Sequence, residues 1–271
     1  PSLIKRSLEN TARPIPNCTV HDVGHGMIQT LDSYSWIQEN GRPTDNVWTT
    51  PTHMQYNVTT RRSGNTCRGV YLRDACDLRQ PLVTKISVMP QFRESGNAIG
   101  GHTHRDRVEF QLRLSLSTTA RWVQTPDQCL LASTGKSFDA RIDPTGLAPG
   151  LHVAEIQGRS QSGTGQQEGP LFRFPVTVLI PEISPKQESS SNGSTSYCYE
   201  LRLEPGQVVR KFLTIPENST WVDISVSGGD AYGGGDSGAN PRLYALHLQQ
   251  VYDNEAHRDL TFKSFFYLGN P

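Results

Sequence analysis

Two histidines and a glutamate have the residue types and the spacing of metal ligands. One residue separates His102 from His104, and four residues lie between His104 and Glu109. Alternate side chains of a β-strand point to the same face, so the two imidazoles could bind one ion together. Imidazole and carboxylate groups are common ligands of transition metals. The spacing therefore permits a metal site in which Glu109 joins the two histidines.

With Gly96 upstream, this group of residues resembles most of the first metal-binding motif of the cupin family. The glycine that closes the motif after the glutamate is absent, and only scattered Pro and Gly residues and His152 could represent the second motif. Residues 93–107 are polar and rich in glycine, which is typical of a solvated loop. A cupin-like metal-binding sandwich is therefore an alternative interpretation, and we expect no metal or cofactor site in the chain.

The tetrapeptide Gly235-Asp236-Ser237-Gly238 resembles the nucleophile loop of chymotrypsin-like proteases, with Ser237 at the position of the nucleophile. Such a serine needs a histidine base and donors for the oxyanion, and no histidine here has a matching sequence context. The tetrapeptide lies in the glycine-rich residues 228–240, which lack the Lys-Ser or Lys-Thr of a phosphate-binding loop. We expect a hairpin loop at this position and no catalytic residue.

The composition excludes several classes of partner. Its 26 basic residues balance 26 acidic ones, which gives no electrostatic footprint for nucleic acid or an anionic membrane. No apolar run approaches the roughly 18 residues of a membrane span. The cysteines are scattered and odd in number, which favours reduced thiols in a reducing compartment; they are Cys18, Cys67, Cys76, Cys129 and Cys198. Four short glycosylation sequons, which begin at Asn17, Asn57, Asn192 and Asn218, are the contrary signal.

The first forty residues have the pattern of two short helices. Residues 3–9 place apolar side chains on one side, and Pro14 prevents the helix from continuing. A second helical pattern runs through Leu31, Tyr34 and Ile37, with Thr30 as a candidate N-cap. A glycine turn between the two patterns indicates that the helices form one unit.

From about residue 55 the hydrophobic period changes to two, which predicts antiparallel β-strands with one buried face. The best alternation is in residues 108–117, and turn sequences rich in Pro, Gly and Asp separate several strands. The other predicted strands are 69–73, 82–89, 121–124, 137–142, 151–157, 172–180, 197–203, 207–215, 221–227, 242–249 and an apolar segment at 262–268. This spacing favours an antiparallel β-sandwich or jelly roll, followed by part of a second sandwich.

The opening residues resemble the end of a catalytic domain of the subtilisin family. The matching stretches are IKRSLENTA (4–12) and GHGMIQTLDSYSWI (24–37), with Gly24, Gly26, Met27 and Ile28 at the positions of a glycine-containing turn before the last helix. A glycine pair lets the backbone turn tightly against neighbouring structure. The resemblance implies that residues 1–40 are the C-terminal helices of a subtilisin-like α/β domain.

The rest of the chain is similar to the tripeptidyl peptidase II family of subtilisin-type serine exopeptidases. The similar stretches are RGVYLRD (68–74), FQLRLSLSTTARWVQTP (110–126), DARIDPTGLAPGLHVAEIQG (139–158), GPLFRFPVTVLIP (169–181) and LEPGQVVRKFLTIPENSTWVDISV (203–226). The resemblance implies a cytoplasmic enzyme that removes tripeptides from free N-termini of oligopeptides and forms very large homo-oligomers. The motif around the family's catalytic serine is absent here, so we expect the catalytic triad and the oxyanion residue to lie before Pro1.

We therefore predict a non-catalytic scaffold and assembly segment of such an enzyme. Its predicted parts are the helices at 1–40, a first sandwich at 41–181, a polar linker at 182–196 and the start of a second sandwich at 197–271. A stand-alone β-sandwich interaction module, for example an adhesion domain, is a further alternative.

The same interpretation leaves the apolar sides of the first helices without their usual partners. These side chains are Leu3, Leu8, Ile28 and Leu31. Burial of apolar surface is worth roughly 25 cal/mol per Å², so several such side chains in water are costly. We expect residues 1–40 to pack on the first sandwich, to mediate self-association, or to be poorly held.

Overall fold

The chain forms two units, each of which is described by itself. The computed structural model describes residues 2–16, 18–40, 53–59, 66–92, 108–161, 169–182, 197–203, 207–215, 221–226, 242–249 and 261–268. Contacts within the chain group Pro1–Thr214 into one unit and Ile215–Pro271 into a second. No helix in the described ranges combines the length and the apolar character that crossing a membrane requires.

The first unit begins with three helices. They are α1 (Ser2–Thr11), α2 (Val20–Val23) and α3 (Thr30–Asn40). The two predicted helices correspond to α1 and α3, and Thr30 is the first residue of α3. Arg13 and Met27 form an isolated antiparallel bridge that brings the chain after α1 beside the chain before α3. We call residues 2–40 the helical module.

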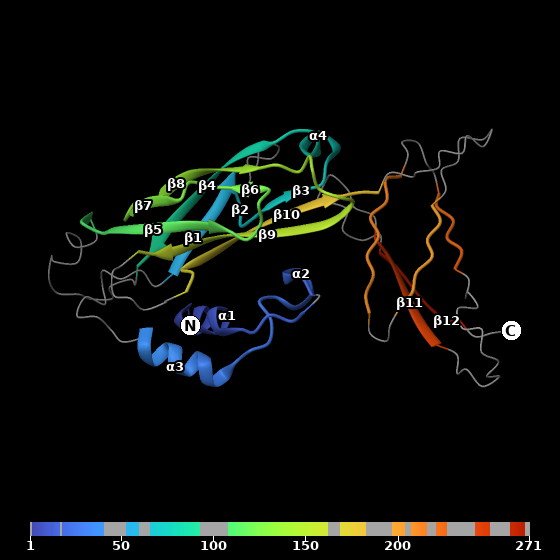
Figure 1. Ribbon diagram of the computed structural model, residues 1–271, viewed down its shortest axis with the longest axis horizontal. Helices are drawn as coiled ribbons and strands as arrows, with labels where there is room; N and C mark the ends of the chain where they lie inside the picture. The colour runs from blue at the N-terminus through green and yellow to red at the C-terminus, as the bar shows by residue number, and fades with distance from the viewer. Residues whose placement is uncertain are drawn as a thin grey trace. The chain divides into compact units, whose positions relative to one another are not determined.

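Two five-stranded sheets follow and form the predicted sandwich (Figure 1). The first sheet has the order β2-β1-β4-β8-β6, with β1 at His53–Thr59, β2 at Thr66–Cys67, β4 at Leu82–Gln91, β6 at Val123–Gln124 and β8 at Lys136–Ile142. The second has the order β3-β10-β9-β5-β7, with β3 at Val70–Leu72, β5 at Gln111–Thr118, β7 at Gln128–Ala132, β9 at Gly150–Ser160 and β10 at Phe172–Ile180. A short helix, α4 (Ala75–Leu78), follows β3. The strand pairs of both sheets are antiparallel except β3 with β10, which is parallel.

The core lies between these two sheets, where the inward side chains of their strands pack together. Phe174 of β10 is completely buried, and the Tyr56 ring meets it edge-on with ring centroids 5.7 Å apart. Other fully or almost fully buried side chains are Ile86, Val88, Leu114, Val123, Leu131, Ala140, Ile142, Ala154, Ile156, Val176 and Val178. The mainly antiparallel sandwich predicted from the alternation is confirmed.

Several strands differ from their predicted bounds. The strand expected at 108–117 begins at Gln111, because Val108 is helical with an exposed side chain and Glu109 lies in a turn. Sequence periodicity did not identify β1, β2 or β7. In β7 an exposed Leu130 stands between the buried Cys129 and Leu131, which hides the alternation.

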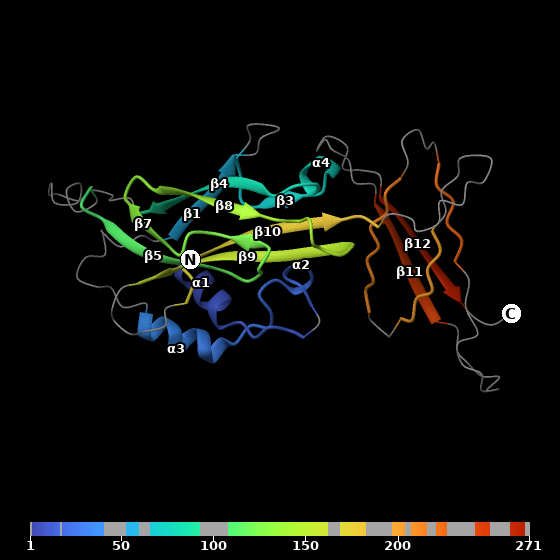
Figure 2. The same ribbon diagram turned by 45° about the horizontal axis from the view of Figure 1, so that its top comes forward.

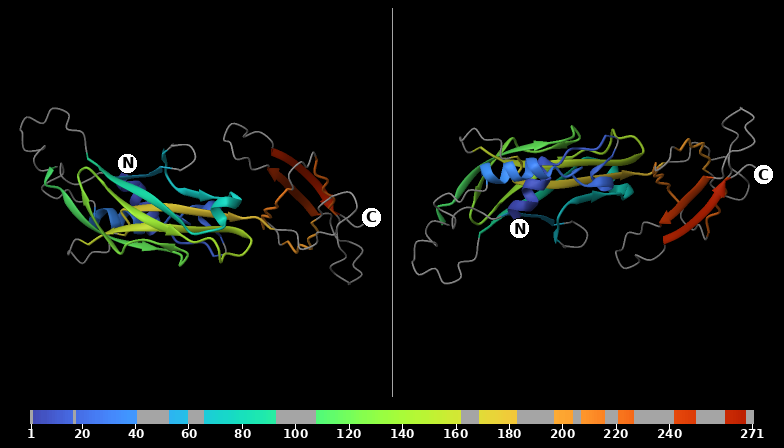
Figure 3. Two further views of the ribbon diagram at one scale, coloured as in Figure 1. Left: turned by 90° about the horizontal axis from the view of Figure 1, so that it is seen from above. Right: turned by 90° about the horizontal axis from the view of Figure 1, so that it is seen from below.

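The predicted strands at 197–203, 207–215 and 221–227 are wrong for the residues that the structure describes there. Leu213 makes a single parallel bridge with Glu182, and the described residues of these segments otherwise have no ladder. Their apolar side chains are mostly exposed, with Trp221 at 79%. A period-two pattern becomes a strand only where a neighbouring chain supplies hydrogen bonds. In the second unit, β11 (Arg242–Gln249) and β12 (Thr261–Leu268) form an antiparallel pair along their full lengths (Figure 3). The strand predicted at 242–249 is β11, and the apolar segment at 262–268 lies in β12.

The helical module covers the outer face of the second sheet over β9 and β10. Figures 1 and 2 show α1 between these strands and α3. Both strands are consequently buried on two faces. Glu155 and Thr177 point away from the core, yet each of them is buried, with only 7% of its surface exposed. The expectation that residues 1–40 pack on the sandwich is therefore met in this structure.

Candidate functional site

The sequence candidates for chemistry fall largely outside the described residues. His102, His104 and Ser237 belong to segments that the structure does not describe, and Glu109 lies in an exposed turn before β5. Within the described ranges there is no group of three or more His, Cys, Asp or Glu side chains arranged to hold a metal ion. The alternative metal site therefore remains a sequence hypothesis.

The most distinctive surface of the described chain is the helical module and the polar layer beneath it. Inside the module, α1 packs on α3, and the buried hydroxyl oxygens of Ser7 and Ser33 lie 2.8 Å apart. The Arg6 guanidinium lies 5.2 Å from the centre of the Trp36 ring, at cation–π distance. These contacts fix the two longer helices against each other.

A glycine shapes the connection between the helices, as the glycine pair in the sequence indicated. Gly26 has a φ of +114°, and a Cβ atom at this position would lie 2.2 Å from the backbone oxygen of Arg13. The close approach allows Arg13 and Met27 to exchange two backbone hydrogen bonds of 2.9 Å. Any larger residue at position 26 would disturb this bridge.

Charged and polar side chains join the underside of the module to the second sheet. Arg173 of β10 donates a hydrogen bond of 3.2 Å to Glu155 of β9 and another of 3.2 Å to the side-chain oxygen of Asn10 in α1. His25 places Nδ1 3.6 Å from the second carboxylate oxygen of Glu155. We call Asn10, His25, Glu155 and Arg173 the polar junction. A buried carboxylate is costly unless it is paired and hydrogen-bonded, and these contacts meet that requirement.

Two further contacts extend this attachment. The side-chain amide of Asn10 donates to the backbone oxygen of Pro170, at 3.3 Å. The adjacent Gly169 has a φ of +71°, and a Cβ there would lie 2.6 Å from the Asn10 amide nitrogen. In α2, Nε2 of His21 lies 3.0 Å from the hydroxyl oxygen of Thr177 on β10. The helical module is thus held to the turn before β10 and to the strands β9 and β10.

The junction also influences a neighbouring phenol. Burial raises the pKa of Tyr56, and the negative charges of Glu9 and Glu155 raise it further. Tyr56 belongs to β1 of the opposite sheet and contacts Phe174 in the core. The carboxylates of Glu9 and Glu155 therefore act on a residue that packs against the core as well as on the helices.

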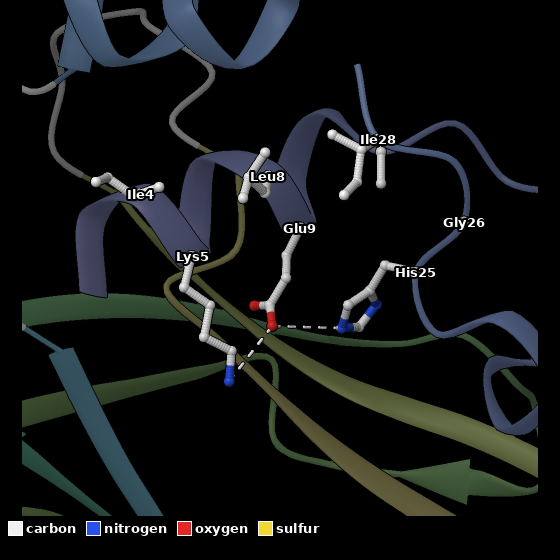
Figure 4. Close-up of a pocket in the computed structure, with 8 residues that line it drawn as sticks. Ile4, Lys5, Leu8, Glu9, His25, Gly26 and Ile28 are labelled. Carbon is white, nitrogen blue, oxygen red and sulfur yellow. Dashed lines mark ion pairs between the residues drawn. The ribbon is translucent and has the colours of Figure 1, made fainter. Parts of the chain in front are cut away.

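An open pocket of about 510 Å³ lies along α1. Figure 4 shows Lys5, Glu9 and His25 on its charged side, where Glu9 lies 3.6 Å from Lys5 Nζ and 3.8 Å from His25 Nε2. The apolar lining comes from Ile4, Leu8, Ala12 and Ile28. The residues that line the pocket include no serine, threonine or cysteine.

Large apolar side chains of the helical module are exposed, and two of them, Ile4 and Ile28, belong to the lining of the pocket. Leu31 is 81% exposed, Ile28 60% and Ile4 55%. Met27 and Tyr34 are also exposed. We call these five residues the exposed apolar set. Exposed apolar surface of this kind commonly marks a contact with another domain or protein. Of the four side chains predicted to lack partners, Ile28 and Leu31 are exposed, whereas Leu3 and Leu8 are partly buried.

Sequence reasoning missed the polar junction. Its strongest signal was the presence of Glu155 and Arg173 inside two predicted strands whose neighbouring residues are apolar. Alternation alone predicts that such residues face solvent. The structure shows that the helical module covers them.

Comparison with known proteins agrees with this arrangement. Residues 54–179 match the family model described as the first Ig-like domain of tripeptidyl-peptidase II. The Tripeptidyl-peptidase 2 of Arabidopsis thaliana is 28% identical over 233 residues, which are 83% of this chain and 15% of the relative. That of Drosophila melanogaster is 27% identical over 267 residues, or 96% of this chain and 17% of the relative.

The fold has a counterpart among solved structures. A crystal structure of tripeptidyl peptidase 2 superposes with a TM-score of 0.71 at 23% sequence identity, and the match covers 99% of this chain and 21% of that one. The chain thus spans only a small part of the proteins it resembles. The chain is therefore similar over most of its length to tripeptidyl-peptidase 2 proteins, and its residues 54–179 match the model of their first Ig-like domain.

Proposed function

We propose that the chain is the non-catalytic supporting segment of a subtilisin-type serine exopeptidase that removes tripeptides from free N-termini of oligopeptides. Residues 1–40 are the last helices of the catalytic domain in this proposal, and 41–181 form the first sandwich. Residues 182–196 are a linker, and 197–271 begin a second sandwich. The peptide substrate binds to the rest of the enzyme.

The two unlike sides of the helical module carry the proposal. Its underside is joined to the sandwich by the polar junction, whereas Ile4, Ile28 and Leu31 are exposed. An element with one side fixed in polar contacts and another left apolar is suited to connect two domains. The sandwich then positions the helices, and the helices support the catalytic domain.

The chemistry of the chain is consistent with a supporting role. A serine peptidase needs a serine, a histidine base and oxyanion donors in mutual reach. Among the described histidines, His21 contacts Thr177, His25 contacts Glu9 and Glu155, and His152 lies 2.7 Å from the backbone oxygen of Ala148. None of these contacts is with a serine.

A fluorophosphonate probe tests the proposal directly. The 271-residue chain should remain unlabelled and should release no product from a fluorogenic tripeptide substrate. A longer protein that includes the preceding residues should be labelled and active, and it serves as the positive control. Labelling of any serine of the 271-residue chain would contradict the assigned role.

We also propose that the enzyme is cytoplasmic and assembles into large homo-oligomers. Free thiols at Cys18, Cys129 and Cys198 support a reducing compartment. Sedimentation velocity on the longer protein should give a species many times heavier than one chain. A monomer at micromolar concentration would argue against assembly while leaving the peptidase proposal intact.

A further inference from the structure

We propose that α2 is a latch that holds the segment before the second unit against the helical module. This exit segment is defined as residues 207–214. It contacts α2 on one side and the end of the first sandwich on another. The inference concerns contacts within Pro1–Thr214 and does not rest on the proposed function.

Apolar burial does not hold the exit segment in place. Residues 207–211, 213 and 214 are exposed, and only Phe212 is partly buried. Val208 is 69% exposed. Because little apolar surface is removed from water, the position of this segment depends on its polar contacts.

The first of these contacts is the ion pair between Arg210 and Asp22 of α2. The Asp22 carboxylate also accepts hydrogen bonds from the backbone N–H and the hydroxyl of Thr19, at 2.9 and 2.8 Å. These bonds form part of the capping box of α2. They orient the carboxylate before the guanidinium binds, which lowers the entropy lost when the pair forms.

The neighbouring residue attaches α2 to the sheet. Nε2 of His21 lies 3.0 Å from Oγ1 of Thr177, and Thr177 is buried on β10. Successive residues of one helical turn therefore contact a central strand and the exit segment. A movement of α2 away from β10 would move the partner of Arg210 with it.

The second anchorage belongs to the sandwich itself. Glu182, two residues beyond β10, donates its backbone N–H to the oxygen of Phe212 at 2.7 Å. Its carboxylate accepts a hydrogen bond of 2.9 Å from Lys211, and the same ammonium lies 4.6 Å from the centre of the Tyr199 ring. Arg210 and Lys211 thus bind different parts of the first unit.

The consequence is mechanical coupling between distant parts of the sequence. With both anchorages formed, the helical module, β10 and the exit segment move together. Loss of the α2 contact leaves the exit segment with its other contacts, which include those with Glu182 and the hydrogen bond of 2.7 Å that the Tyr197 hydroxyl donates to the backbone oxygen of Thr214.

Hydrogen exchange measured by mass spectrometry on the whole 271-residue chain tests the latch. Arg210→Gln should speed exchange of the exit segment about two- to fivefold, the range expected from loss of an exposed ion pair, with β9 and β10 unchanged. His21→Ala should have a similar effect on the exit segment by detaching α2 from Thr177. Arg202→Gln, which removes a nearby exposed charge, is the matched control and should leave the exit segment unchanged.

A double-mutant cycle separates the latch from a general charge effect. If Asp22 and Arg210 act as a pair, Asp22→Asn combined with Arg210→Gln should accelerate exchange no more than the stronger single substitution. Unchanged exchange in Arg210→Gln, an equal effect of Arg202→Gln, or additive effects in the double variant would each overturn the proposal.

Discussion

Glu155 and Arg173 lie on adjacent antiparallel strands, and their side chains meet at 3.2 Å beneath the helical module. The carboxylate is 10% exposed and the guanidinium side chain 19%. This pair occupies the face of the sheet that a simple sandwich would leave in water. It is therefore the best point at which to test how the helices are held.

Arg173→Met should lower the free energy of unfolding by about 2–3 kcal/mol, because the buried carboxylate of Glu155 loses its nearest cation and Asn10 loses a donor. Urea denaturation measures the change. Arg113→Met, at an exposed position of β5, should change stability by no more than about 0.5 kcal/mol. Equal effects of the two substitutions would show that the polar junction contributes nothing specific.

Gly26→Ala should destabilise the helical module by about 3 kcal/mol, since an alanine at a φ of +114° is strained and its Cβ would collide with the Arg13 carbonyl. Hydrogen exchange of residues 2–40 reports the loss. Gly24 also has a positive φ, of +63°, but nothing lies within 4 Å of an added Cβ. Gly24→Ala introduces backbone strain without the collision and should therefore cost less than Gly26→Ala; a cost as large as that of Gly26→Ala would refute the steric explanation.

Phe174→Ala should cost about 3–5 kcal/mol, because it empties a fully buried position and removes the edge contact with Tyr56. Thermal or urea unfolding of the chain checks this. Leu130→Ala on β7 removes a side chain that is half exposed and should cost less than about 1 kcal/mol. Equal losses of stability in Phe174→Ala and Leu130→Ala would contradict the placement of Phe174 in the core.

The ion pair between Asp22 and Arg210 should persist on acidification until the pH is low. Hydrogen bonds from the backbone and hydroxyl of Thr19, together with Arg210, lower the pKa of Asp22 to about 2 from the ordinary value of 3.8. A group whose pKa is lowered in the folded state contributes its full stabilisation above its unfolded pKa and loses it as the pH falls through its folded pKa. The contribution of Asp22 should thus be constant at neutral pH and fade between about pH 4 and 2.

A carboxylate NMR titration measures this directly. Arg210→Gln should raise the midpoint of Asp22 while leaving it below the ordinary value, because the hydrogen bonds from Thr19, the larger cause, remain. A midpoint of 3.8 or above in the unsubstituted chain would contradict the described geometry.

Leu31→Asp should leave the stability of the 271-residue chain within about 0.5 kcal/mol, since this side chain is exposed. Under the proposed function, the same change in the longer protein should reduce stability and peptidase activity, because Leu31 then faces the catalytic domain. Val108→Asp, at an exposed position beside β5, is the control. An unaffected longer protein would remove Leu31 from the proposed contact.

Hydrophobic periodicity predicted the strands whose outer faces are exposed to solvent. It failed for segments whose burial or pairing depends on residues far away in the sequence. Leu112, Leu114 and Leu116 alternate with polar residues, and β5 buries that face as expected. On β9, Glu155 also fits an alternating pattern, yet the helices bury it. The pattern at 207–215 shows the opposite error, since an apolar alternation there has no sheet to join. Local sequence encodes the period, whereas the second face of a strand depends on residues far along the chain.

The position of β10 has a consequence for the order of folding. It is the last strand of its sheet in the sequence, yet it lies between β3 and β9 and pairs Val176 with Val70. Until residue 180 has left the ribosome, β3 has no partner in that sheet, and the surface that receives Asn10, His21 and His25 is incomplete. Long-range pairing of this kind slows folding. The N-terminal helices therefore cannot dock on the sheet until β10, which is synthesised about 150 residues later, has formed.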